Sequence, residues 1–253
     1  MMGTKALLAA ASAAALLLAS QANAASILAM KLSDLTPDAS SAGRLDAYSG
    51  WTDGTGWNEG VAGATDLVNN GIDYRNGSID WAEVESVRVS MYSQGSEVAY
   101  VEFDAAGTTM TDFFAVANVS GSSWPDDLTT DVHNYFSIAG HTSNDRHWYI
   151  NRNYGGCGSD VGHMVVLDGD GADACSWETT RTDDIGLTNR GFLYSTLTTD
   201  TNWNNTGGQV GVADVFAVHV TVGGDVPLPA SLVLMGTALG GLGAARRFAR
   251  KAG

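Results

Sequence analysis

Short runs in which apolar and polar residues alternate are the main structural signal in this chain. Val87, Val89 and Met91 alternate with polar residues, and a spacing of two is typical of a strand with one buried face. The clearest run of this kind covers residues 215–222. A polar segment at 93–97 precedes another apolar run, which predicts a hairpin at that point. Further strands are predicted at residues 98–103, 112–118, 134–139, 146–151, 162–168 and 191–197.

The spacing of these runs predicts a mostly β fold, of the β-sandwich or jelly-roll-like type. Long helical periodicity is hard to find between residues 25 and 225, whereas turn-forming Gly, Ser, Thr, Asn and Asp are scattered throughout. A segment of about two hundred residues can bury a sizeable core. We therefore expect one β-rich domain over residues 25–225, flanked by an N-terminal signal peptide and a C-terminal membrane-spanning helix.

The N-terminal segment has the three parts of a secretory signal peptide. Lys5 supplies the positive charge, residues 6–19 form an apolar run of Ala and Leu, and the segment ends in Ala-Asn-Ala. The apolar run is short for a bilayer span of ~20 residues, so an N-terminal anchor is the weaker alternative. We expect cleavage between Ala24 and Ala25, which makes residues 1–24 the signal peptide.

The C-terminal segment, residues 226–253, combines prolines, an apolar stretch and a basic end. Residues 230–245 carry no charge, and with the four preceding residues they are long enough for a thin bilayer. Pro227 and Pro229 fit the start of such a helix, because proline lacks an amide donor. The positive-inside rule keeps the basic end in the cytoplasm and the body outside that membrane. The basic stop consists of Arg246, Arg247, Arg250 and Lys251.

This order of parts resembles the VPLPA-CTERM sorting signal, a relative of the PEP-CTERM signals of Gram-negative bacteria. The resemblance covers only the last 28 residues. It implies recognition and cleavage by an exosortase-type membrane enzyme, and delivery to the cell surface or extracellular matrix, where such proteins are commonly associated with exopolysaccharide. An ordinary C-terminal anchor that is never cut is the alternative. The residues that match the motif are Val226, Pro227, Leu228, Pro229 and Ala230.

The charge of the body excludes one class of partner. All 28 acidic residues lie between Asp34 and Asp225, whereas only eight basic residues lie in residues 25–225. The body therefore carries a net charge of about −20. A surface of this charge repels phosphate backbones, which excludes nucleic-acid binding.

The chain has two cysteines, Cys157 and Cys175. An even number of cysteines in an exported chain favours a disulfide, and a CxxC spacing typical of metal or redox pairs is missing from the sequence. We expect a structural disulfide that stabilises the fold by ~3 kcal/mol. A free catalytic thiol is the weaker alternative.

Residues 141–178 hold the densest set of side chains that could bind a ligand or take part in catalysis. Their order resembles a Cys-bridged domain of secreted animal matrix and adhesion proteins, over roughly residues 130–222. The resemblance implies an extracellular structural or binding domain, and it supplies no catalytic residue. The segments that carry it are 146–151, 153–157, 160–164, 168–173 and 175–178, followed by 192–195, 202–204 and 211–216.

A group of aromatic and polar residues in this region predicts sugar binding. Flat aromatic rings stack on the apolar faces of sugars, and Asp or Asn side chains hydrogen-bond to the hydroxyls. The alternative is that the aromatics face the core while Asn and Asp cap turns. The candidate ligand-binding residues are Trp148, Tyr149, Asn151, Tyr154, Asp160 and Trp203.

Asp168, Asp170 and Asp173 form a candidate calcium site, because calcium prefers hard oxygen ligands. The EF-hand pattern fails, since Ala172 stands where a third ligand belongs and Thr179 stands at the twelfth position. An acidic turn in solvent is the alternative. Calcium is the one cofactor that the sequence suggests.

Signatures of catalysis are weak. His141, His147 and His163 lie near Asp145 and Asp160 in the sequence, but their spacing matches no zinc motif such as HExxH. A Gly-x-Ser-x-Gly elbow is also missing. The sequence therefore predicts a non-catalytic surface or matrix protein with polysaccharide as a candidate partner. A secreted polysaccharide-acting hydrolase and a calcium-dependent adhesin are the alternatives.

Overall fold

The computed structural model describes residues 25–33, 45–168, 175–178 and 190–223. Within it, Ala25–Val222 forms one compact unit. The predicted signal peptide, the predicted sorting tail and two candidate calcium ligands, Asp170 and Asp173, lie outside the described residues. Among the residues that are described, none of the helices has both the length and the apolar character of a membrane span.

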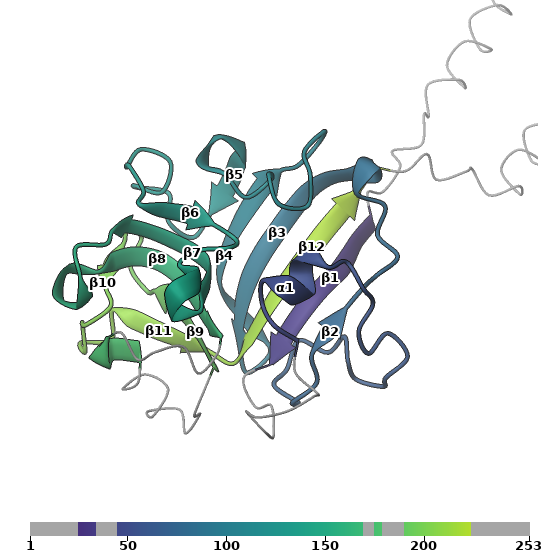
Figure 1. Cartoon of the computed structure of the whole chain (residues 1–253), viewed down its shortest axis with the longest axis horizontal. Coiled ribbons are helices and arrows are strands. Elements are labelled where there is room, and N and C mark those ends of the chain that lie inside the picture. The colour runs from purple at the N-terminus through teal and green to yellow at the C-terminus, as the bar shows by residue number, and fades with distance from the viewer. Residues whose placement is uncertain (1–24, 34–44, 169–174, 179–189, 224–253) are drawn as a thin grey trace, which may run out of the picture. The chain divides into compact units, whose positions relative to one another are not determined.

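The first of two antiparallel sheets has the strand order β2-β1-β12-β3-β4-β5 (Figure 1). The predicted hairpin is confirmed as β3 and β4, whose turn places Gln94 and Gly95 at φ of 51° and 79°. Two successive positive φ angles match the twist of a hairpin, and Gly95 adopts its own without steric cost. The strands of this sheet are β1 (Ala25–Ser33), β2 (Tyr74–Arg75), β3 (Val84–Ser93), β4 (Ser96–Asp104), β5 (Val119–Ser122) and β12 (Val215–Val222).

The second antiparallel sheet has the order β11-β9-β8-β7-β6, with β10 paired to β8. Its strands are β6 (Tyr135–Ser137), β7 (Arg146–Asn153), β8 (Val161–Asp168), β9 (Arg190–Ser195), β10 (Thr201–Asn202) and β11 (Val210–Ala213). The helices whose bounds lie within the described residues are short: α1 (Ser49–Thr52) and the 3-10 turns η2 (Trp81–Glu83), η3 (Val116–Asn118), η4 (Thr142–Asn144) and η5 (Cys157–Ser159). The prediction of a mostly β body is therefore confirmed.

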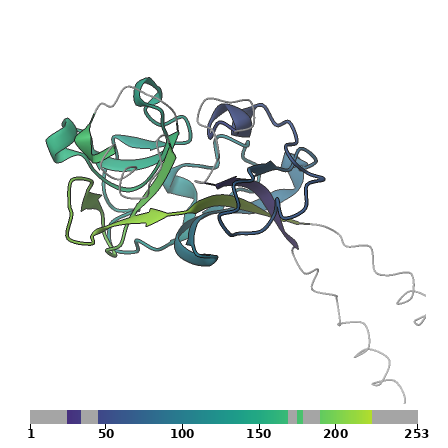
Figure 2. The ribbon, with the colours of Figure 1, turned by 90° about the horizontal axis from the view of Figure 1, so that it is seen from below.

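One apolar core is shared by the two sheets. Asp214 alone separates β11 from β12, so the chain passes directly from the second sheet to the first (Figure 2). Phe216 on β12 packs against Trp148 of β7 at 5.2 Å and against Phe192 of β9 at 6.1 Å between ring centroids. All three rings are fully buried. Phe216, Val218 and Val220, which alternate along β12, all belong to this core, so the predicted strand at 215–222 is confirmed.

The predicted strand at 112–118 is wrong. This stretch forms turns and the short helix η3, and its neighbouring rings Phe113 and Phe114 are both buried in the core. Phe114 lies 5.5 Å from Trp148, and Phe113 lies 5.4 Å from Phe103. A strand would direct neighbouring side chains to opposite faces, whereas this loop directs both rings into one core.

Within the described residues the sequence pattern missed five strands, one of which, β1, lies inside the first sheet between β2 and β12. Its residues 29–33 are all buried, so alternation is lost. Lys31 is among them: its ammonium donates to the Asp66 carbonyl at 3.0 Å and to Asn70 Oδ1 at 2.9 Å. A strand covered on both faces cannot be recognised by alternation. The other missed strands are β2, β5, β10 and β11.

We predict that Phe216→Ala lowers the free energy of unfolding by about 3–5 kcal/mol, because the variant leaves a cavity where both sheets meet. Urea denaturation of wild type and variant measures the loss. Val132→Ala is the control, since Val132 is 87% exposed, and its effect should stay within about 0.5 kcal/mol. Equal, small losses in the two variants would contradict a shared core.

Candidate functional site

The second sheet is buried on both faces, and the face away from the shared core holds a charged network. Arg146, at the start of β7, has a fully buried side chain. Its Nη1 donates to Asp160 Oδ2 at 2.9 Å, its Nε donates to Glu178 Oε1 at 2.5 Å, and its Nη2 lies 3.3 Å from Cys175 Sγ. Buried charges are tolerated only when they are paired in this way.

Asp160 extends the network through its second oxygen. Its Oδ1 accepts hydrogen bonds from the Tyr149 hydroxyl at 2.7 Å and from Asn151 Nδ2 at 2.5 Å. Burial raises the pKa of Asp160, while its hydrogen bond from Tyr149 and the charge of Arg146 act in the opposite direction. Burial, followed by the Asp160 carboxylate, raises the pKa of Tyr149, so its hydroxyl remains a donor. We call Arg146, Tyr149, Asn151, Asp160 and Glu178 the Arg146 network.

The predicted disulfide between Cys157 and Cys175 is confirmed, with the two Cα atoms 5.2 Å apart. It connects η5 to the segment 175–178, whose Glu178 also accepts a hydrogen bond from the Cys175 amide at 2.9 Å. Trp177 packs against Trp203 with ring centroids 5.9 Å apart, and the Arg146 guanidinium lies 4.7 Å from the Trp177 ring centroid. The disulfide thus fixes the segment that covers the Arg146 network.

Five of the six residues predicted to bind ligand gather on this face. Tyr149, Asn151 and Asp160 are hydrogen-bonded to one another. Trp203 belongs to the same apolar cluster as Tyr149, and the Tyr154 ring lies 5.3 Å from the Arg146 guanidinium. Only Tyr154 is partly exposed, whereas the other four have 0% exposed area. In this conformation a sugar ring can reach Tyr154 but not the buried members.

The sixth residue, Trp148, lies on the opposite face, in the shared core. A register shift between His147 and Ile150 and a φ of 46° at Trp148 interrupt the regular alternation of β7. The indole Nε1 of Trp148 donates to the Ala47 carbonyl at 2.8 Å. From Trp148 onward neighbouring side chains still face opposite sides: Trp148 and Ile150 lie in the shared core, whereas Tyr149 lies in the other apolar cluster. Alternation alone therefore separates Trp148 from Tyr149, and the bulge explains instead why Arg146 shares the face of Tyr149.

Asp168, the one candidate calcium ligand among the described residues, faces inward. It is only 6% exposed, and its Oδ2 accepts a hydrogen bond from the Ala47 amide at 2.5 Å. Asp168 therefore anchors the chain before α1 to the end of β8.

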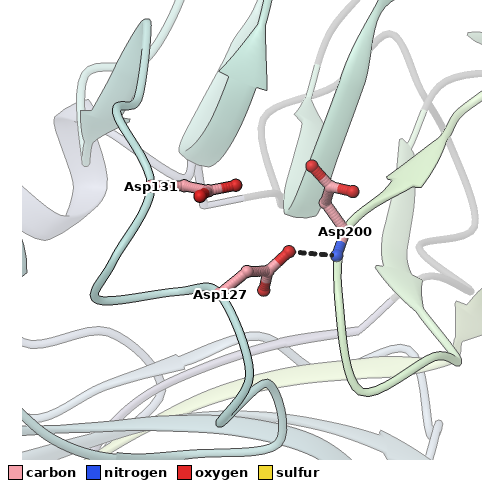
Figure 3. A group of neighbouring side chains, drawn as sticks. All are labelled: Asp127, Asp131 and Asp200. Atoms are coloured by element: carbon pink, nitrogen blue, oxygen red, sulfur yellow. Dashed lines mark hydrogen bonds between the residues drawn. The ribbon is translucent and has the colours of Figure 1, made fainter.

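An acidic cluster that the sequence did not reveal lies on the loops that precede β6 and β10. Asp127, Asp131 and Asp200 place carboxylate oxygens within 4.8 Å of one another (Figure 3). Asp127 Oδ2 also accepts a hydrogen bond from the Asp200 amide at 2.9 Å (Figure 3). Asp127 and Asp200 are far apart in the sequence, so spacing gave no signal. Carboxylates at this separation repel one another unless positive charge is close.

Positive charge is already present beside this acidic cluster. Arg152 lies 3.2 Å from Asp131 and also forms an ion pair with Asp200. His163 Nε2 lies 2.8 Å from Asp127 Oδ1, and its side chain is fully buried. A hard cation could use these oxygens, but it would have to displace Arg152 from two of the three carboxylates. These contacts connect the two loops to β7 through Arg152 and to β8 through His163.

The three histidines considered for catalysis occupy different environments. His147 Nδ1 lies 3.0 Å from the Ala139 carbonyl, and His163 contacts Asp127. His141 packs its ring against Tyr154 with centroids 5.0 Å apart. His133 was not among the candidates chosen from the sequence, and its ring centroid lies 5.6 Å from that of His163. Burial, followed by the charge of His163, lowers the pKa of His133.

We predict that Arg146→Ala lowers the free energy of unfolding by about 3–5 kcal/mol, because two buried carboxylates lose their partner. Arg88→Ala is a matched control, because Arg88 also pairs with two carboxylates, Glu97 and Glu102. The three side chains are 34%, 29% and 40% exposed, and an exposed ion pair contributes only about 0–1 kcal/mol. Urea denaturation without reductant compares the two variants. A loss at Arg146 no larger than that at Arg88 would contradict the stabilising role of the buried pairs.

We also predict that the protein loses stability as the pH falls from about 7 to 5. The folded-state pKa of His133 lies below its usual value, so the unfolded chain binds the proton first, and the free energy of unfolding decreases below about pH 6.5. Burial lowers the pKa of His219 in the same direction. Denaturation at several pH values should show a shallower slope for His133→Gln than for wild type. An unchanged slope would show that His133 does not contribute to the pH dependence of the free energy of unfolding.

Comparison with known proteins adds no family to this picture. No protein-family model, no curated protein and no solved structure matches the chain. The functional argument therefore rests on the sequence motifs and on the residues and contacts described above.

Proposed function

We propose that the protein is an exported cell-surface or extracellular-matrix protein with a β-sandwich or jelly-roll-like body. The signal peptide is removed after Ala24, and residues 226–253 hold the body on the outer side of the cytoplasmic membrane. An exosortase-type enzyme then recognises residues 226–230 and releases the body to the surface. The body acts by binding rather than by catalysis, with polysaccharide as its partner.

The single observation that carries this proposal is the disulfide between Cys157 and Cys175. Disulfides persist in oxidising compartments and are rare in the cytosol. Cys175 is 2% exposed and lies beside Arg146, while Cys157 is partly buried, so the bond ties the interior of the body to its surface. The disulfide is a feature of the body, so it supports export independently of the two apolar ends. Those ends lie outside the described residues.

The hydrolase alternative needs two carboxylates about 5–10 Å apart across a groove. Asp127 contacts His163, and Asp131 and Asp200 contact Arg152. Asp160 and Glu178 both pair with the buried Arg146. These carboxylates are engaged in structural contacts, which favours the binding role. The adhesin alternative requires calcium, and chelation should then lower the melting temperature.

Mass spectrometry of the protein recovered from the cell surface tests the processing. We predict an N-terminus at Ala25 and a C-terminus within or close to residues 226–230. Replacing both Pro227 and Pro229 with Ala should prevent C-terminal cleavage and leave the chain in the membrane fraction. The same measurement on Val132→Ala, a change on the exposed surface of the body, is the control. An intact peptide through Lys251 on the surface-exposed form would contradict cleavage.

A further inference from the structure

A pocket of about 320 Å³ opens on the body at a place that the sequence did not indicate. Three segments that are distant in the sequence form it: Tyr48 before α1, residues 111–115 between β4 and β5, and residues 136–139 at the end of β6. Its volume is at the small end of ligand sites, which span about 300–1,000 Å³. It suits one or two rings of a sugar rather than a large cofactor.

Aromatic rings line this pocket, and each ring is held by a neighbour. Tyr48 stacks on His147 with centroids 5.7 Å apart and an angle of 19° between the planes. His147 is fixed in turn by its contact with the Ala139 carbonyl at 3.0 Å. Phe136 packs on Phe114 at 5.2 Å. Rings fixed before binding offer an apolar face without a large entropy cost, which is what stacking on a pyranose requires.

Polar groups complete the lining. Asp112 is exposed, and among the described residues no side chain or backbone group forms a hydrogen bond or ion pair with its carboxylate. Ser137 Oγ accepts a hydrogen bond from the Gly140 amide at 3.3 Å, so its own hydroxyl hydrogen is free to donate. One charged acceptor and one hydroxyl donor beside aromatic rings match the hydroxyls and the apolar face of a sugar.

The charge of the site selects among sugars. Among the described residues that line the pocket, Asp112 is the single charged one, and it belongs to a chain with a formal net charge of −15. Like charges disfavour binding of uronic acids or sulfated sugars. A neutral hexosyl unit avoids this repulsion and can donate its hydroxyl hydrogens to the carboxylate.

We propose that this pocket binds a neutral hexosyl unit of a polysaccharide, with the sugar ring against Tyr48 and Phe136 and its hydroxyls on Asp112 and Ser137. The proposal deepens the polysaccharide-binding role proposed above and rests on it only for the source of the glycan. The pocket lies on loops around β6 and α1. It is thus distinct from the Arg146 network, where the sequence placed its candidate ligand residues.

Isothermal titration calorimetry of the purified protein, in the form that cells produce, tests the proposal. The probes are neutral oligosaccharides of glucose, galactose and mannose, with oligogalacturonate as the acidic comparison. We expect at least one neutral probe to bind and oligogalacturonate to bind at least tenfold more weakly. Binding of the acidic probe alone, or of none of the probes, would overturn the proposal. Neither result bears on export, because mass spectrometry of processing measures that separately.

Variants locate the site. Asp112→Asn and Tyr48→Ala should each weaken binding of the neutral probe about fivefold or more, a loss of ~1 kcal/mol. Asp112→Asn keeps the shape of an exposed side chain, so it stays informative if Tyr48→Ala disturbs the fold. Glu85→Gln removes an exposed carboxylate outside the pocket and should leave binding unchanged. If Tyr154→Ala abolishes binding while both pocket variants bind as wild type, the pocket assignment is wrong.

Discussion

A guanidinium group buried between two carboxylates organises the outer face of the second sheet. Arg146 contacts Asp160, which immediately precedes β8, and Glu178, which lies far along the chain. The disulfide links the same two segments covalently, since Cys157 lies close to Asp160 in the sequence and Cys175 lies close to Glu178. The covalent bond restricts the unfolded chain, and the ion pairs lose much of their value if either partner is missing. Each connection therefore keeps the other in place.

Carboxylates also hold the segment that leads to the pocket. Asp73 accepts hydrogen bonds from the amides of Ser33 and Leu45, both at 2.9 Å. Asp168 accepts from the Ala47 amide, while the Trp148 indole donates to the carbonyl of the same residue. Tyr48 follows directly, so its ring is placed by fixed backbone on one side and by the stacking partner His147 on the other. Part of the acidic composition is thus structural, and the pocket depends on it.

Sequence alternation predicted the strands in which buried and more exposed residues alternate over most of the length, such as β3 and β4, and the cysteine count predicted the disulfide. It failed at β1, which is buried on both faces, and at Phe113 and Phe114, whose loop places adjacent rings in one core. Five of the six residues that were chosen for their aromatic or polar side chains share the face of Arg146. Residue chemistry alone could not show that they are buried, nor find the pocket, because burial and convergence of distant loops depend on pairing between strands.

The disulfide and the Arg146 network together hold residues 175–178 over the second sheet. Hydrogen exchange of the folded protein, measured by mass spectrometry with and without reductant, shows whether they do. On reduction we expect protection to be lost first in β7 and β8, while β3 and β12 in the first sheet stay protected. If β7 and β8 keep their full protection after complete reduction of Cys157 and Cys175, the disulfide does not hold this segment in place.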